Sequence, residues 1–276
     1  MPLIAMTREM GSLGKDVATA ISARLGKPVI HHEMIDHLAN KMRLRKSHVI
    51  RFLDGKANMW ERLTTDETSL AIYTADETLA LAESDSVSVI RGWGSAHLLR
   101  PIPHVICVRV CAPMKLRVQR MMERLNTDDE EFVTNEIKLS EEAHAAITRR
   151  HFGINWQDSD QYDLVLNTER VSVAKCANEV MALVSEPQFQ ETEESRQMLS
   201  NLALEMHVRA ALRADPRTAK MHIAVGVEKG AVALAGIVDR GADPALAGEV
   251  AASVAGVRYV ENQLKVATAS RLKVDG

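Results

Sequence analysis

Residues 6–18, with the sequence MTREMGSLGKDVA, combine glycines and a lysine at a spacing that could hold a phosphate group. Gly14 and Lys15 match the end of the phosphate-loop pattern G-x-x-x-x-G-K-[ST]. Glu9 stands where the pattern has its first glycine, and Asp16 stands where it has the hydroxyl that binds magnesium. Because half of the fixed positions depart from the pattern, the elements around the loop must decide whether it binds phosphate.

A strand is predicted before this loop by the apolar run PLIAM, and a helix after it by apolar residues at helical spacing between 17 and 25. A loop in that position gathers backbone N–H groups and the positive end of the helix dipole at one point. Gly11 and Gly14 allow a phosphate to approach closely, and Lys15 would add a positive charge. The same residues also fit a simpler hypothesis, in which the glycines only form a tight turn and Asp16 favours the first helical turn.

Three further apolar runs, at 87–92, 104–110 and 162–168, are predicted to be buried strands. Long helical patterns separate them, and strands that alternate with helices indicate an α/β domain with a parallel sheet. We assign residues 1–184 to this domain. Residues 185–197 are polar, acidic and without periodicity, which is typical of a linker.

The remaining sequence predicts a second, smaller domain over residues 198–267. Helical and alternating patterns follow one another there in the order α-β-β-α-β. About 70 residues are close to the lower limit for an independent hydrophobic core. Residues 268–276 are expected to form a C-terminal tail.

Composition and charge restrict the class of protein. The chain has 276 residues, of which 46% are hydrophobic and 26% charged, and a net charge of −3 that gives no general basic field for nucleic acid. The N-terminus has no basic region followed by a long apolar core, so no signal peptide is predicted. No apolar run approaches the ~20 residues that a membrane span needs. We therefore expect a cytoplasmic protein without membrane contact.

The segment TREMGSLGKDVATAISARLGKPVIHHEMI resembles the cytidylate kinase-like family, in which the loop is typically Ser-Arg-Glu-Tyr-Gly-Ser-Gly-Gly-Arg-Glu. The resemblance continues through VIRGWGSAHLL, APMKLRVQRMMER and RRHFGINWQDSDQYDLVLNT, and it covers residues 1 to about 184. Glu9 and an acidic residue at position 16 are normal in that family. The two departures from the general pattern are therefore interpreted as a family variant of the loop.

The resemblance implies a nucleoside monophosphate kinase fold that uses ATP and Mg²⁺ and carries an arginine-bearing lid. It places the phosphates of ATP on Gly11, Ser12, Leu13, Gly14, Lys15 and Asp16, with Asp16 positioning magnesium through water. Phosphoryl transfer depends mainly on positioning and charge stabilisation. The residues expected to stabilise the transferred charge are Lys15, Arg8, Arg117, Arg120, Arg124, Arg149 and Arg150. For each of these arginines, the simpler hypothesis is a solvated helix face.

Several departures from the family touch the acceptor side of the site. Trp93 stands where the family has an arginine that is expected to bind the acceptor phosphate, and a tryptophan cannot form two charge-assisted hydrogen bonds. Arg91 is close in sequence, but adjacent strand residues point to opposite faces, so we expect a poor substitute. His31 replaces an aspartate. The segment EEAHAAI, with Glu142, His144, Ala146 and Ile147, replaces a basic, tyrosine-containing one. The predicted acceptor-binding residues are His31, Glu33, Arg91 and Trp93.

Other kinds of site fit the sequence less well. The segment HHEMIDH lacks the H-E-x-x-H spacing of a zinc protease, because His37 comes one residue too late after His32 and Glu33. There is no G-x-S-x-G motif of a serine hydrolase. Trp60, Trp93 and Trp156 are too scattered to form a stacking platform for single-stranded nucleic acid.

The second domain is similar to the BON domain over residues 198–267. The similarity rests on IAVGVEKGAVALAGIV and on the ending AGVRYVENQLKV. BON domains are usually thought of as ligand- or phospholipid-associated modules, often in the cell envelope. The alternative is a module for dimerisation or docking, and we favour regulation or oligomerisation over lipid contact because no signal peptide is predicted.

These observations lead to three functional hypotheses. The first is an ATP-dependent nucleotide kinase that phosphorylates a pyrimidine nucleoside monophosphate or a related small acceptor. The second is a nucleotide-sensing regulatory protein with weak or no catalysis, which signals through its BON domain. The third is a structural interaction protein that has lost ATP binding, and the retained Gly-x-x-Gly-Lys core argues against it.

Overall fold

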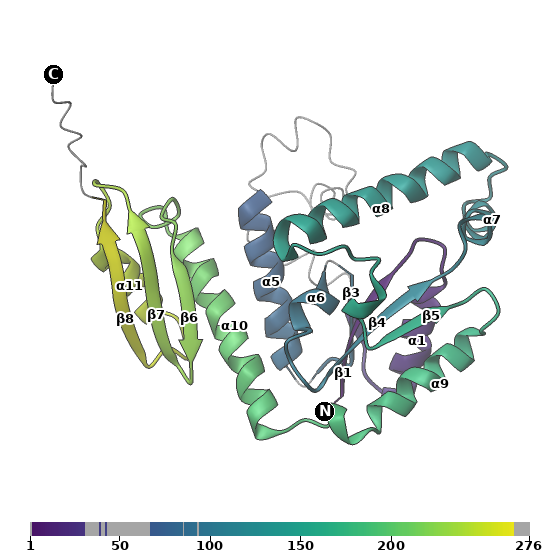
Figure 1. The fold of residues 1–276 in the computed structure, drawn as a ribbon, viewed down its shortest axis with the longest axis horizontal. Helices are drawn as coiled ribbons and strands as arrows, with labels where there is room; N and C mark the ends of the chain where they lie inside the picture. Colours follow the sequence, from purple (N-terminus) through teal and green to yellow (C-terminus); the bar gives the residue numbers. More distant parts are fainter. Residues whose placement is uncertain are drawn as a thin grey trace. The chain divides into compact units, whose positions relative to one another are not determined.

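The structure is a computed structural model, and it describes residues 2–30, 39, 42, 67–84, 86–92 and 94–267. The chain divides into two compact units, residues 1–196 and 197–276, and each unit has its own sheet (Figure 1). In the described part of the chain, no helix has the length and apolar character needed to cross a membrane.

The sheet of the first unit is parallel and has β1 at its centre. Its strands are β1 (Leu3–Arg8), β2 (Val29–Ile30), β3 (Val89–Arg91), β4 (Val105–Cys111) and β5 (Leu164–Asn167). They lie in the order β2-β3-β1-β4-β5, and every neighbouring pair is parallel. This confirms the predicted α/β class. Because all strands run the same way, the carboxyl ends of β3, β1 and β4 meet at one edge, where open α/β sheets bind their ligands.

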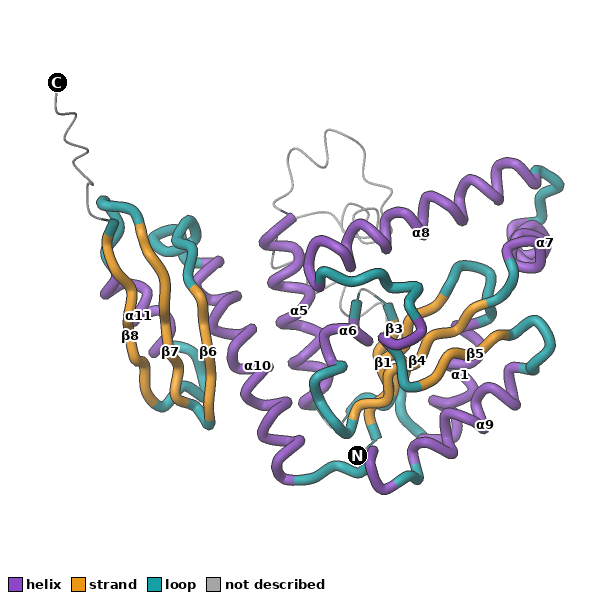
Figure 2. Tube along the Cα trace, in the orientation of Figure 1, coloured by secondary structure: helices purple, strands orange, loops and turns teal. Residues whose placement is uncertain are grey.

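Helices cover both faces of this sheet. They are α1 (Gly14–Leu25), α5 (Glu67–Glu83), α6 (Ser95–Leu99), α7 (Met114–Leu125), α8 (Glu130–Phe152) and α9 (Val173–Val184). The helices α1 and α9 lie together on one face, and α5 and α6 lie on the opposite side (Figure 2). Two short 3-10 helices, η1 (Ser159–Gln161) and η2 (Pro187–Phe189), complete the unit.

Alternation along the strands decides which side chains enter the main core. Ile4 and Met6 of β1 are fully buried in a core cluster with Val17 of α1 and Val180 of α9. Because successive strand residues point to opposite faces, Thr7 points away from this cluster. The hydrophobic residues of β1 thus fix the direction of the polar residues that follow at its carboxyl end.

The second unit has the predicted order α-β-β-α-β. Its elements are α10 (Glu193–Ala214), β6 (Ala224–Glu228), β7 (Ala231–Val238), α11 (Pro244–Ala252) and β8 (Tyr259–Val266). The pair β6–β7 is antiparallel and the pair β7–β8 is parallel. Val208 and Leu212 of α10 pack with Leu234 of β7 and Ala251 of α11 in a separate core. The sheet therefore buries one face against the two helices.

Residues 185–197, which are predicted to form a linker without periodicity, contain regular structure. It includes η2 and the first turn of α10. Thr192 and Ser195 cap this helix reciprocally, since the N–H of each residue donates to the side-chain oxygen of the other, at 2.9 and 3.1 Å. Ser195 also lies 2.8 Å from the buried Nδ1 of His104, and both residues belong to the first unit.

Candidate active site at the carboxyl ends of the parallel strands

The loop between β1 and α1 is a tight turn that requires glycine at position 11. Gly11 has φ +80° and Leu13 has φ +61°, both in the left-handed region. A Cβ on Gly11 would lie 2.7 Å from the backbone oxygen of Arg117, so no larger residue fits there without movement of α7. Glu9 does not have a positive φ, which explains why the first position of the loop does not need glycine.

The charged side chains of the loop face solvent at the start of α1. Lys15 and Asp16 are exposed, and neither side chain has a hydrogen bond or ion pair with the described residues. Ser12 is fully buried, and its Oγ has no hydrogen-bond partner in the described part of the chain. The loop thus combines available charges with an unsatisfied hydroxyl, an arrangement that fits a bound phosphate.

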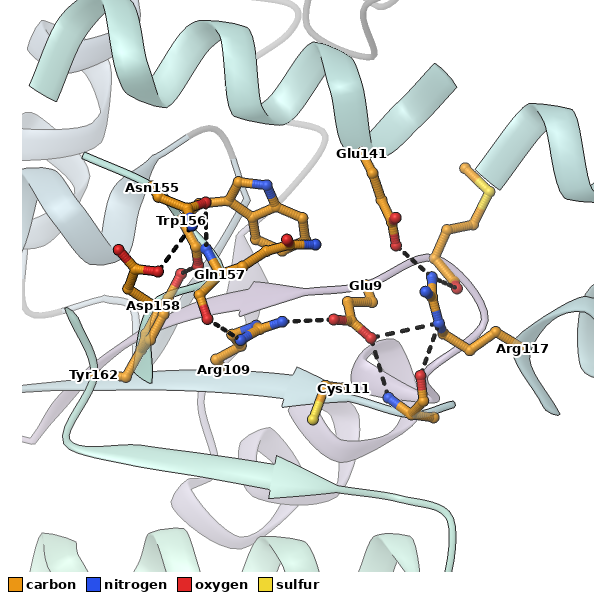
Figure 3. Close-up of polar contacts among 12 residues, drawn as sticks. Glu9, Arg109, Cys111, Arg117, Glu141, Asn155, Trp156, Gln157, Asp158 and Tyr162 are labelled. Carbon is orange, nitrogen blue, oxygen red and sulfur yellow. Dashed lines mark hydrogen bonds and ion pairs between the residues drawn. The ribbon is translucent and has the colours of Figure 1, made fainter. Parts of the chain in front are cut away.

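Glu9 is the centre of a buried ion-pair network, shown in Figure 3. Its carboxylate accepts a hydrogen bond of 2.6 Å from Nη2 of Arg109 and one of 3.1 Å from the backbone N–H of Ala112. Nε of Arg117 lies 3.4 Å from the same carboxylate. Side-chain exposure is only 7% for Glu9 and 6% for Arg117. Glu9 therefore ties the loop to the carboxyl end of β4 and to α7.

Arg117 extends this network to α8. Its Nη1 lies 2.6 Å from a carboxylate oxygen of Glu141, and its Nε donates to the backbone oxygen of Ala112 at 2.8 Å (Figure 3). Nη1 also donates to the backbone oxygen of Met10 at 3.3 Å. The structure thus surrounds the Arg117 guanidinium with partners from the protein itself.

Arg120 supports the loop from the next turn of α7. Its guanidinium donates to the Thr168 hydroxyl at 3.0 Å, to the Thr168 backbone oxygen at 2.9 Å and to the Gly11 backbone oxygen at 3.4 Å. The hydroxyl of Thr168 in turn donates to the backbone oxygen of Ser12 at 2.8 Å. One turn farther along the same helix face, Arg124 is exposed.

Arg91 is buried at the end of β3, on the same side of the sheet as the start of α1. It aligns with Met6 of β1, and both therefore point to the face covered by α1. The expectation that Arg91 is a poor substitute for an arginine at position 93 remains a prediction, because position 93 lies outside the described residues. Burial lowers the pKa of Arg91 to about 10, with Arg8 and Arg124 adding repulsion and Asp16 opposing it. Nε and Nη1 of Arg91 have no partner in the described structure.

A cluster of aromatic and histidine side chains lies at the same edge of the sheet, on the face opposite to α1. The rings of His144 and Trp156 are stacked, with centroids 4.4 Å apart and planes 5° apart, and the Arg109 guanidinium lies 5.3 Å from the Trp156 ring. Tyr162 donates to the backbone oxygen of Trp156 at 2.6 Å. Burial lowers the pKa of His97 and of His144 to about 4, so both are neutral at pH 7.

Of the remaining predicted site residues, only Arg149 and Arg150 lie in the described part of the chain. Arg149 and Arg150 are exposed near the end of α8. His31, Glu33 and Trp93 lie outside the described residues, as do His32 and His37 of the rejected zinc motif. Within the described ranges, no three His, Cys, Asp or Glu side chains form a group that could hold a metal ion.

Sequence reasoning missed Arg109, Glu141 and the packing of Trp156. The signal for Arg109 is visible in the run HVICVRV, where a single charge near the carboxyl end of a buried strand requires a partner. The partner itself, Glu9, is 100 residues away in sequence. Glu141 lies on a long polar helix, where nothing distinguishes it from its neighbour Glu142.

Comparison with known families agrees with this geometry. The model of the cytidylate kinase-like family matches residues 3–170. The chain belongs to the cytidylate kinase-like family. The BON domain model matches residues 200–268, which include the sheet and α11 of the second unit. The family and the kinase-like fold support a nucleotide kinase-like function.

Individual relatives cover about half to two thirds of the chain. A cytidylate kinase from Methanothermobacter thermautotrophicus is 27% identical over 155 residues, which are 56% of this chain and 87% of that protein. An uncharacterized protein from Eubacterium ventriosum has a similar solved structure, with a TM-score of 0.53, 20% identity, and coverage of 67% of this chain and 99% of that one. A shikimate kinase from Acinetobacter baumannii aligns at a TM-score of 0.41 and 13% identity over 67% of this chain and 93% of its own.

Proposed function

We propose that this protein is an ATP-dependent kinase that transfers a phosphoryl group to a pyrimidine nucleoside monophosphate or a related small acceptor. The observation that carries the proposal is the glycine-dependent loop between β1 and α1, with Lys15 exposed at its end. Backbone N–H groups at a helix N-terminus are a common phosphate site. Family membership and the cytidylate kinase relative support the choice of acceptor class.

The donor phosphates would lie on residues 11–16, where Lys15 supplies a positive charge. Asp16 is exposed in the first turn of α1 and suits a magnesium ion held through water, because Mg²⁺ usually keeps several waters and takes few carboxylates. Bound magnesium would neutralise charge on the phosphates during transfer. The orphaned hydroxyl of Ser12 offers a further hydrogen bond to the same group.

The arginines of α7 divide into two roles. Arg117 and Arg120 hold the shape of the loop through protein partners, so we assign them to positioning. Arg8 and Arg124, with Arg149 and Arg150 near the end of α8, would supply the charge that stabilises the transferred group. This division differs from the expectation that every arginine of α7 touches phosphate.

Two observations favour the alternative, a nucleotide-sensing protein with weak or no catalysis. Because Arg117 and Arg120 are engaged within the protein, fewer arginines are available to stabilise transfer. Trp93 also replaces the arginine expected on the acceptor phosphate. In that case the BON domain would report the bound nucleotide to a partner or to a second copy of the chain.

Calorimetric titration and phosphate-transfer assays distinguish the two proposals. ATP with magnesium is titrated into the wild type, Lys15→Ala and the control Lys220→Ala, which alters an exposed lysine of the second unit. Transfer is then assayed with CMP, dCMP and UMP. Binding that requires Lys15, with turnover of one acceptor, supports the kinase. Binding without turnover supports the sensor, and no binding by folded protein contradicts both.

A further inference from the structure

Arg91 is a buried cation at the carboxyl end of β3. Only 5% of the residue is exposed, and its Nε and Nη1 have no partner among the described residues. A buried charge without a partner is costly, so proteins rarely retain one unless something else binds it. The position, at the carboxyl end of β3 beside β1, is where a ligand would lie.

The charges that surround Arg91 are mostly of the same sign. Arg8 ends β1 two residues after Met6, the register partner of Arg91, so strand alternation directs both arginines to the same face. Arg124 approaches from α7, and Asp16 from α1 is the acidic group that opposes them. Two further guanidinium groups, from β1 and α7, therefore add positive potential at Arg91 beside the loop.

We propose that Arg91, with Arg8 and Arg124, forms a phosphate-binding site at the carboxyl end of β3, beside the loop between β1 and α1. A phosphate dianion offers several acceptor oxygens, and a guanidinium binds two of them at once. Such a group would satisfy the orphaned nitrogens and reduce the repulsion among the three arginines. The inference rests on the proposed function only for the origin of the phosphate.

Two sources could supply this group, namely the phosphomonoester of the acceptor and the terminal phosphate of the donor. The backbone N–H groups of residues 11–16 and Lys15 already serve the donor in the proposed function. CMP and ATP are therefore separate probes, and cytidine serves as a probe with the same base but no phosphate. Inorganic phosphate is the fourth probe, because its binding requires neither transfer nor a base.

The variants are Arg91→Met, which removes the charge, and Arg91→Lys, which keeps the charge but loses the two-pronged geometry. Arg170→Met is the matched control, because Arg170 is exposed and its side chain has no hydrogen bond or ion pair with the described residues. Lys15→Ala separates this site from the loop. Affinities come from calorimetric titration, and stability from thermal unfolding with and without phosphate at constant ionic strength.

We expect Arg91→Met to lose at least about tenfold in affinity for CMP, as removal of a charge-assisted pair usually does, while cytidine binds as weakly as to the wild type. A loss confined to ATP would support the same site and assign it to the donor. Without ligand, Arg91→Met should unfold at the same temperature as the wild type or above it, because an uncompensated buried cation has been removed.

The opposite outcomes overturn the proposal. One is that folded Arg91→Met binds CMP, ATP and inorganic phosphate as the wild type does. Another is that Arg91→Met is less stable than the wild type without ligand while Arg91→Lys is not, which would make Arg91 a structural residue. A phosphate response that depends on Arg91 and not on Lys15 would support the site even if ATP binding and transfer failed. If Arg91→Met transfers phosphate as the wild type does, the proposed kinase function stands and the proposed phosphate site at Arg91 is ruled out.

Discussion

At the scale of single residues, the loop illustrates how far a motif predicts structure. Gly14 and Lys15 are visible in the sequence, and the structure places them at the start of α1 as expected. The contacts that Glu9 makes in place of the usual glycine are with Arg109, Ala112 and Arg117, which are about 100 residues away. A sequence pattern predicts the local backbone conformation, whereas the partners of a buried charge depend on the complete fold.

The requirement for glycine at position 11 is testable against a matched position. Gly11→Ala and Gly26→Ala both place a Cβ on a left-handed backbone, with φ of +80° and +67°, but only position 11 has a neighbouring atom in the way. Left-handed strain costs about 1–2 kcal/mol at either position. We expect Gly11→Ala to be the less stable variant in urea denaturation and to lose ATP binding. Equal stability and equal ATP affinity of the two variants would contradict the close contact with α7.

His144 predicts a pH dependence of stability. Burial lowers the pKa of His144 from 6.5 to about 4. In the unfolded chain His144 is therefore protonated near pH 6.5, whereas in the folded chain it is protonated only near pH 4. The stability that depends on neutral His144 is fully present above about pH 6.5 and is lost as the pH falls towards 4. The loss is on the order of 3 kcal/mol for a shift of this size.

His144→Phe isolates this effect because it keeps a ring against Trp156 and removes the titration. Unfolding free energies measured between pH 7 and 4.5 should fall less steeply for the variant than for the wild type. The carboxylates of the protein titrate in both, so they cancel in the difference. Parallel curves for the two proteins would show that His144 does not resist protonation.

At the scale of elements, the strands and the order of elements were predictable, but the docking of helices was not. Short apolar runs located β1, β3, β4 and β5, because a parallel strand that is buried on both faces needs continuous apolar sequence. Helical spacing put Arg117, Arg120 and Arg124 on one face but could not show which of them are engaged by the protein. The start of α10 carries its own signal, since Thr192 and Ser195 are spaced for reciprocal capping.

The ion-pair network of Glu9 is predicted to hold β4, α7 and α8 to the loop. Glu9→Ala leaves Arg109 and part of Arg117 as buried cations, a change that typically costs about 3–5 kcal/mol. We expect a loss of that order in urea denaturation, and a smaller loss for Glu9→Gln, which retains a hydrogen-bond acceptor. Glu169→Ala, at an exposed position, serves as the control. A Glu9→Ala protein as stable as the control would show that the network contributes little.

At the scale of the whole molecule, the two units have separate hydrophobic cores, one around Ile4 and Ile21 and one around Val208 and Leu234. Chains with two cores often unfold in more than one step. The proposed domain limits, 1–184 and 198–267, and the proposed role of the second unit in oligomerisation or partner binding remain predictions. If the second unit is independent, a nucleotide should stabilise only the unit that binds it. If the second unit senses the nucleotide, both units should be stabilised.

Differential scanning calorimetry of the full chain tests this expectation. We expect two transitions, of which ATP with magnesium raises only one, because a ligand stabilises the unit that binds it. The shift should disappear in Lys15→Ala. If ATP raises both transitions, the two units are coupled and the sensor hypothesis gains support. If a single transition persists under all conditions, the chain unfolds as one cooperative unit.

The contacts of the loop also have a consequence for the order of folding. Glu9 and Gly11 are made early in synthesis, but the atoms that complete their environment belong to Arg109, Ala112 and Arg117. Contacts between residues so distant along the chain form slowly, because a long segment must be ordered before they are gained. A nascent chain that ends before α7 therefore cannot build the loop. The capacity to bind a nucleotide should arise late, well after the residues that define it have left the ribosome.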